Sequence, residues 1–128
     1  MMDALQVAKK LFAAVEAGDV ETVRRLYAPE FRIWHNYDGV AQTADENLGV
    51  LRWLVANVSN RRYEEVRLQK TDDGFVQQHV LRGTTTSGKT LELPACMLGT
   101  VKDGKIVRLD EYFDAAHLAV LEGGLGSS

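Results

Sequence analysis

The chain of 128 residues has little of several features that mark whole classes of protein. Cys96 is the only cysteine, which excludes an internal disulfide and any metal cluster built on cysteines. The 15 basic residues are outnumbered by 18 acidic ones, so no basic surface is available for nucleic acid or an anionic membrane. No apolar run could span a bilayer, and Met1 to Asp3 do not open a signal peptide. We therefore expect a cytoplasmic protein without nucleic-acid or membrane partners.

The remaining composition is that of one globular domain. A chain of this length can bury an ordinary core, and 45% hydrophobic with 26% charged residues is typical of such domains. Neither an internal repeat nor a domain boundary is visible. The final GGLGSS is rich in glycine and serine, which favours a flexible tail. We predict a single domain over residues 1–122 and a flexible tail over residues 123–128.

Two helices are predicted at the start of the chain. Between Asp3 and Ala17, apolar residues recur every three or four positions, the spacing of a helix with one buried face, and Asp3 can cap its start. Gly18 follows as a C-terminal cap, and a second helix can begin at Asp19. This helix ends before Pro29, because the residue preceding a proline avoids the helical conformation. The apolar faces of both helices need a partner.

A strand, a short return strand and a third helix come next. Residues 31–36 alternate as a strand does, and residues 40–42 form the return strand. Thr43 and Glu46 then have the spacing of a capping box, in which each side chain bonds the backbone N–H of the other. The helix that they open is predicted to run to about Val58.

The second half of the chain has the period of two that is typical of strands, with turns that contain glycine. The expected strands are residues 63–71, 75–86, 90–101 and 105–113. Asp114 can cap a short final helix. Three helices followed by such strands predict an α+β fold, in which a cone-shaped, curved antiparallel sheet is covered on its concave side by the N-terminal helices. A cone closed at one end contains a pocket.

The segment Phe31 to Gly39 concentrates reactive side chains. Because side chains alternate along a strand, Phe31, Ile33 and His35 share one face. A histidine that enters an apolar interior beside two core residues is the most function-like feature of the sequence. The alternative interpretation is a core histidine whose ring nitrogens are satisfied by backbone groups or by Tyr27.

The last predicted strand offers two carboxylates. Alternation puts Glu111 on the same face as Leu109 and Phe113, and Asp110 on the other face. If the apolar set faces the cone, Glu111 is the buried acid, whereas a bulge would reverse the assignment. A three-residue turn before this strand would place Asp110 beside Cys96, and a two-residue turn would place Glu111 there. The sequence leaves both possibilities open.

The order of these elements agrees with several short segments that point to one superfamily. The segments are Phe12-(x)5-Gly18-Asp19-Val20-Glu21, Tyr27-Ala28-Pro29-Glu30-Phe31, Asp103-Gly104-Lys105-Ile106-Val107 and Asp110-Glu111-Tyr112-Phe113-Asp114. In their order and spacing they resemble the nuclear transport factor 2-like (NTF2-like) superfamily, in its SnoaL-like and ketosteroid isomerase-like branch. The resemblance implies the cystatin-like α+β roll of that superfamily, but it specifies little chemistry.

The comparison with ketosteroid isomerases can be made at three positions. Those enzymes use a pocket aspartate as the base, together with a tyrosine and a protonated aspartate that stabilise the enolate. The corresponding positions here are His35, Leu11 and Cys96. Histidine can act as a base near neutral pH, but leucine donates nothing and a thiol donates weakly. Losing one such donor costs about a hundredfold in rate, so the resemblance does not imply the isomerases' own mechanism.

We predict a pocket for a small hydrophobic carbonyl or polycyclic compound. One hypothesis is a cofactor-independent isomerase, cyclase or dehydratase, in which His35 is the general acid/base and Asp110 or Glu111 sets its tautomer or shares its proton. Tyr37 or Tyr112 would then donate to the developing oxyanion. The other hypothesis is a non-catalytic binding or dimerisation module. The expected substrate-binding residues are Leu11, Trp34, Asn36, Tyr37, His79, Cys96, Tyr112 and Phe113.

No metal and no cofactor are expected. His35 and His79 lack a third ligand at a recognisable spacing, which makes them a poor metal site. The resemblance also implies a homodimer formed across the convex faces of two sheets. Val80, Met97 and Tyr112 are the residues that we expect to point outward there.

Overall fold

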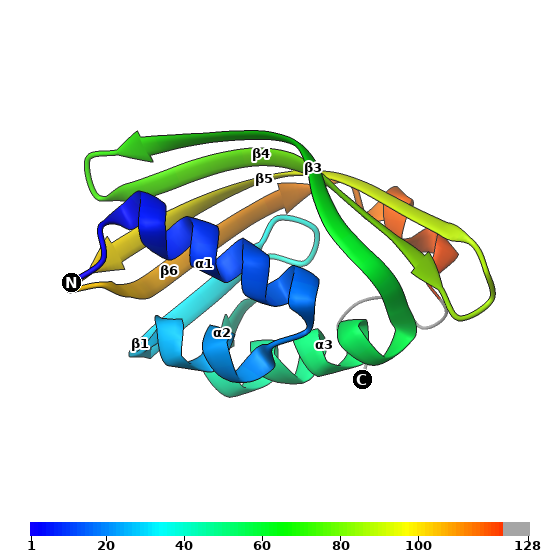
Figure 1. Ribbon diagram of the computed structural model, residues 1–128, viewed down its shortest axis with the longest axis horizontal. Helices are drawn as coiled ribbons and strands as arrows, with labels where there is room; N and C mark the ends of the chain where they lie inside the picture. The colour runs from blue at the N-terminus through cyan, green and yellow to red at the C-terminus, as the bar shows by residue number, and fades with distance from the viewer. Residues whose placement is uncertain (122–128) are drawn as a thin grey trace.

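The computed structural model describes residues 1–121 and has three helices packed on one side of a curved, unclosed sheet of six strands (Figure 1). The α+β fold class is therefore confirmed. The predicted tail, residues 123–128, lies outside the described residues. The elements are α1 (Ala4–Ala17), α2 (Val20–Leu26), β1 (Tyr27–His35), β2 (Ala41–Thr43), α3 (Ala44–Asn57), β3 (Val58–Thr71), β4 (Gly74–Thr85), β5 (Thr90–Lys102), β6 (Lys105–Phe113) and the 3₁₀ helix η1 (Ala115–Val120).

The predicted helix caps are confirmed. The Asp3 side chain accepts from the Gln6 backbone, and the Gln6 side chain accepts from the Asp3 backbone. Gly18 ends α1 with a φ of 74°, a left-handed conformation that glycine adopts without steric cost. Thr43 and Glu46 form the capping box at the start of α3. Within residues 1–121, no helix is long and apolar enough to cross a membrane.

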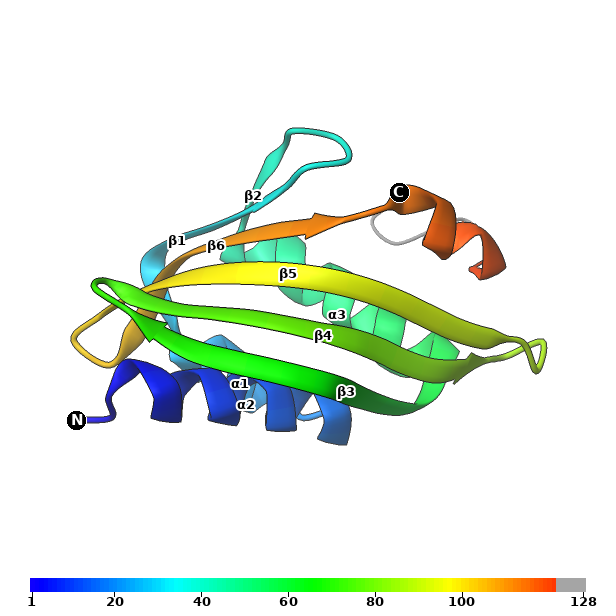
Figure 2. The ribbon, with the colours of Figure 1, turned by 90° about the horizontal axis from the view of Figure 1, so that it is seen from above.

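The strand order in the sheet is β2-β1-β6-β5-β4-β3, and the strands lie side by side in this order in Figure 2. Neighbouring strands are antiparallel except β1 and β6, which run parallel. In this parallel pair Ile33 lies opposite Leu109, and His35 lies opposite Glu111. The pairing joins the two strands that carry the predicted reactive residues.

The register of β5 and β6 differs from both sequence-based alternatives. Lys102 pairs with Lys105, so the turn between them has two residues, but the register shifts by one position next to Thr100. A β-bulge of this kind adds one unpaired residue to a strand. As a result Cys96 pairs with Tyr112, and neither carboxylate lies beside it.

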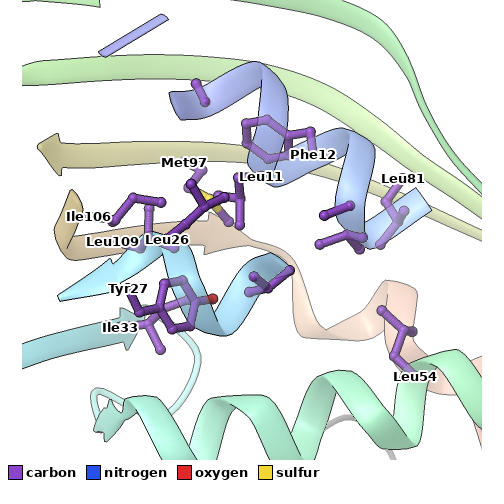
Figure 3. Packing of buried hydrophobic residues seen from close by; sticks show 14 of the residues in the cluster. Leu11, Phe12, Leu26, Tyr27, Ile33, Leu54, Leu81, Met97, Ile106 and Leu109 are labelled. Carbon is purple, nitrogen blue, oxygen red and sulfur yellow. The ribbon is translucent and has the colours of Figure 1, made fainter. Parts of the chain in front are cut away.

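The core lies between the helices and the concave face of the sheet. Figure 3 shows Leu11 from α1 close to Met97 from β5, with Ile33 and Leu109 from the neighbouring strands nearby. The expectation that Met97 points outward is therefore wrong. Met97 lies opposite Glu111 in an antiparallel pair, so both side chains point to the same, inner face.

Candidate functional site

A cavity lies between the helices and the concave face of the sheet. Its cavity volume is about 80 Å³, and the space between its lining atoms amounts to about 740 Å³ when the open solvent at its mouth is included. Most of its lining is apolar and comes from α1, α3 and the inner faces of the strands. A small number of polar residues interrupt this lining, as is typical of ligand sites. They are Tyr27, His35, Tyr37, Gln42, Asn47, Tyr63 and Glu111.

His35 and Glu111 form a pair at the edge of the cavity. The parallel pairing of β1 and β6 aligns the two residues, and Nε2 of His35 lies 3.2 Å from Oε1 of Glu111. The side chains are only 10% and 16% exposed, so water screens their interaction weakly. Within the described part of the chain, Nδ1 of His35 is buried and has no hydrogen-bond partner.

This geometry favours one neutral tautomer of His35. If Nε2 carries the proton, it can donate to the Glu111 carboxylate, and Nδ1 keeps a lone pair. The other tautomer would leave a buried N–H without an acceptor, at a cost of about 1–3 kcal/mol. In the favoured tautomer, Nδ1 of His35 therefore has a free lone pair that could accept a proton.

Tyr37, in the turn after β1, borders this pair. Its ring centre lies 5.5 Å from that of His35 and 5.1 Å from that of Phe113. Burial raises the pKa of the Tyr37 hydroxyl, and the negative charges of Asp38 and Glu111 raise it further. The phenol therefore keeps its proton at neutral pH and can act as a donor.

The charge of Glu111 also affects the pKa values of two more tyrosines, Tyr27 and Tyr63. The Tyr27 hydroxyl donates to Oδ1 of Asn47 over 2.7 Å, and its ring stacks on Phe31. Burial, reinforced by Glu111, raises the pKa of both Tyr27 and Tyr63. The charge of Glu111 therefore favours the protonated form of all three tyrosines that line the cavity.

Five of the predicted site residues line this cavity: Leu11, His35, Tyr37, Glu111 and Phe113. Sequence reasoning left open which carboxylate faces the pocket. The structure resolves the question geometrically, because Glu111 points inward, whereas Asp110 lies on the outer face with its carboxylate 2.9 Å from Arg108. The alternation of side chains along β6 separates the two neighbours.

The other predicted residues lie elsewhere. Trp34 packs edge-to-face on Tyr112 on the outer side of the sheet, with ring centres 5.4 Å apart. Cys96 and Tyr112 border a shallow outer groove. Asn36 accepts a hydrogen bond from the Phe113 backbone N–H through its side chain, which joins the ends of β1 and β6. Strand alternation therefore turns Trp34, Cys96 and Tyr112 away from the cavity. Asn36 has a structural role, because its side-chain oxygen is bonded to the backbone.

His79 does point to the concave side but is part of the packed core. It is buried, packs edge-to-face on the rings of both Phe12 and Tyr63, and has its Nδ1 2.9 Å from Nε2 of Gln77. Burial lowers the pKa of His79, and the charge of Glu111 opposes this change. Among residues 1–121, no group of three or more His, Cys, Asp or Glu residues is arranged to hold a metal ion.

Sequence reasoning missed Gln42 and Asn47 as lining residues. Asn47 lies one helical turn before Leu51, which also lines the cavity, so helical spacing could have identified it. Gln42 belongs to a strand of three residues, too short for an apolar alternation to define its inner face.

Comparisons with known proteins agree with the fold. IdmH from Streptomyces antibioticus, a proposed polyketide cyclase, is 24% identical over 95% of this chain and 99% of its own, with a TM-score of 0.79. A ketosteroid isomerase-like protein from Catenulispora acidiphila, in complex with trimethylamine, is 15% identical over 89% and 90%, with a TM-score of 0.77. An LEH-like epoxide hydrolase from M. tuberculosis is 16% identical over 97% and 90%, with a TM-score of 0.75.

Such identities establish a shared fold and not a shared activity. No curated protein matches the chain. The family model of the SnoaL-like domain, in contrast, matches residues 8–109, which include α2, α3 and the strands β1 to β5. The predicted resemblance is therefore confirmed, and the chain belongs to the SnoaL-like domain family.

Proposed function

We propose that the protein is a cofactor-independent enzyme that transfers protons on a small hydrophobic carbonyl or polycyclic compound, as an isomerase, a cyclase or a dehydratase. The observation that carries this proposal is the His35–Glu111 pair, with Nε2 and Oε1 3.2 Å apart and Nδ1 without a partner among residues 1–121. A buried imidazole that is oriented by a carboxylate is a recurrent arrangement for general acid/base catalysis.

In the proposed reaction, Nδ1 of His35 removes a proton from the carbon next to the substrate carbonyl. The electrons of the broken C–H bond form a carbon–carbon double bond, and the carbonyl π electrons move to oxygen. The hydroxyl of Tyr37 donates to this oxyanion, and Glu111 stabilises the imidazolium through Nε2–H.

The fate of the enolate distinguishes the three reaction types. Return of the proton to a different carbon gives an isomerase, attack of the enolate carbon on a second carbonyl gives a cyclase, and loss of a β-hydroxyl as water gives a dehydratase. In each case the proton held by His35 goes back to the product or to the leaving hydroxyl. The apolar lining of the cavity would strengthen these electrostatic interactions by keeping water away.

A non-catalytic binding module is the second candidate. It is favoured by the burial of Nδ1, because a ligand must displace a neighbouring side chain before it reaches this atom. The apolar lining would bind a hydrophobic ligand equally well without any chemistry.

Proton exchange separates the two candidates. Deuterium incorporation next to the carbonyl of α-tetralone, followed by NMR in D₂O, tests the enzyme directly. We expect exchange to be catalysed by the wild type and reduced about a hundredfold in His35→Gln and Glu111→Gln. Asp110→Asn is the matched control, because it neutralises the adjacent carboxylate on the outer face. Equal exchange in the wild type and His35→Gln would refute the enzyme proposal.

The dimer expected for this family remains a proposal as well. Leu98 and Tyr112 are 42% and 46% exposed on the outer face of the sheet, which supports a contact there. Sedimentation at micromolar concentration should give a dimer, and Leu98→Lys should give a monomer. A monomeric wild type under these conditions would rule this contact out.

A further inference from the structure

Two buried side-chain nitrogen or oxygen atoms of residues 1–121 lack a hydrogen-bond partner, and both belong to residues that line the same cavity. They are Nδ1 of His35 and Oε1 of Gln42. A buried polar atom without a partner costs about 1–3 kcal/mol, and native proteins contain few of them. His35 has a place in the proposed reaction, but Gln42 has none. Its unpaired oxygen therefore calls for an explanation.

The fold holds Gln42 in a defined position. Gln42 pairs with Ile33 across the β1–β2 ladder, and Thr43, the next residue, caps α3. Ile33 and His35 both line the cavity, so Gln42 is the diagonal neighbour of His35 on the same face. Such diagonal neighbours are roughly 7–8 Å apart, and the distance between their β-carbons is somewhat shorter. A single bicyclic ligand is long enough to span this separation, and it must displace neighbouring side chains to reach the two atoms, because both are buried.

The nearby polar groups do not satisfy Gln42. Among residues 1–121, no hydrogen bond reaches the side-chain oxygen of Gln42. An amide oxygen needs a donor, whereas a ketone or ether oxygen offers only lone pairs. A hydroxyl supplies the donor and costs much less to desolvate than a charged ammonium group does.

We propose that Gln42 is a specificity-determining residue that accepts a hydrogen bond from a hydroxyl group of the ligand. The protein then selects hydroxylated compounds over otherwise identical ethers and hydrocarbons. This inference rests on the proposed function only in taking the cavity as the ligand site. It does not require proton transfer, so binding measurements can test it separately.

Binding of β-naphthol, its methyl ether and naphthalene, measured by calorimetry or fluorescence, provides the test. We expect the wild type to bind β-naphthol about tenfold more tightly than the ether, as one well-placed hydrogen bond allows. Gln42→Met keeps the length of the side chain and removes its acceptor. This variant should bind the naphthol and the ether almost equally and naphthalene as the wild type does. Gln78→Met, on the exposed outer face, is the matched control and should keep the preference.

Several results would overturn the inference. One is a preference for β-naphthol that is unchanged in Gln42→Met and lost in His35→Gln, because the hydroxyl would then bind His35. Another is tighter binding of the ether by the wild type, which would mean that the amide presents its NH₂ group. A third is the absence of binding by all three probes. Gln42→Leu repeats the test if thermal unfolding shows that Gln42→Met is not folded.

Failure of the proposed function has a different signature. If the preference depends on Gln42 and yet no variant or wild-type protein exchanges the protons of α-tetralone, the cavity selects hydroxylated ligands without catalysis. The Gln42 inference then stands and the enzyme proposal falls. The reverse result is also possible to observe. If proton exchange depends on His35 but the preference for β-naphthol does not depend on Gln42, the enzyme proposal stands and the Gln42 inference falls.

Discussion

His35 and Glu111 occupy directly opposite positions in the parallel pair of β1 and β6, with Nε2 and Oε1 3.2 Å apart. Backbone pairing alone brings these side chains together from opposite ends of the chain. The neighbouring pair, Trp34 and Asp110, has the same register but faces the outer side. One strand pair therefore presents an imidazole–carboxylate pair to the cavity and an unrelated pair to the exterior.

Tyr37→Phe should slow proton exchange by about ten- to a hundredfold, because it removes the proposed oxyanion donor and keeps the ring. The pKa of Tyr37 is raised from its ordinary value of 10.0. Deprotonation of Tyr37 should therefore not reduce the exchange rate of the wild type below pH 10.0. The measurement is the pH dependence of exchange into α-tetralone. Tyr112→Phe, on the outer face, is the matched control and should leave exchange unchanged.

His79 should make the fold less stable as the pH falls. Its pKa is lowered from 6.5 by burial, so the unfolded chain binds a proton at a higher pH than the folded chain does. Between these two pKa values the unfolded state binds more protons, and the free energy of unfolding decreases with decreasing pH. Urea unfolding should therefore show that the free energy of unfolding falls as the pH is lowered below 6.5, and that this fall is smaller in His79→Phe than in the wild type.

The phenylalanine in that variant preserves a ring in contact with Phe12 and Tyr63 but leaves Gln77 without its partner. Lower stability at every pH is therefore expected, and the slope against pH is the informative quantity. His117→Phe changes an exposed histidine and is the control. An unchanged slope in His79→Phe would assign the acid sensitivity to other groups.

Local patterns in the sequence predict the elements of this fold well. The caps at Asp3 and Thr43 form as expected, because each depends on residues within one helical turn. The parallel pairing of β1 with β6 depends on residues far apart in the chain, and no local pattern specifies it. The bulge beside Thr100 is equally invisible, so the neighbour of Cys96 could not be predicted.

The same distinction applies to the candidate site. His35 could be placed on the inner face because Phe31 and Ile33 define that face. Its carboxylate neighbour stayed open between Asp110 and Glu111, since the choice depends on where a β-bulge interrupts the strand pair, and local alternation does not specify that position. The inward orientation of an isolated glutamine such as Gln42 is a tertiary property.

Two glycines offer a matched test of packing behind the cavity. Gly99 lies opposite Phe75, and a β-carbon at position 99 would come within 2.2 Å of that fully buried ring. Phe75 packs edge-to-face on Phe12, which lines the cavity, so the ring has little room to move. We expect Gly99→Ala to lower the free energy of unfolding by about 1–3 kcal/mol, the usual cost of overpacking a core.

Gly49 is the control for the same chemical change. It lies inside α3, and a β-carbon there would have no neighbour within 4 Å. Because alanine is the better helix former, Gly49→Ala should raise the free energy of unfolding by up to about 1 kcal/mol. Urea unfolding of the two variants therefore compares one added methyl group in a packed sheet and on an open helix. Equal effects would contradict the tight contact between Gly99 and Phe75, whereas opposite signs would support it.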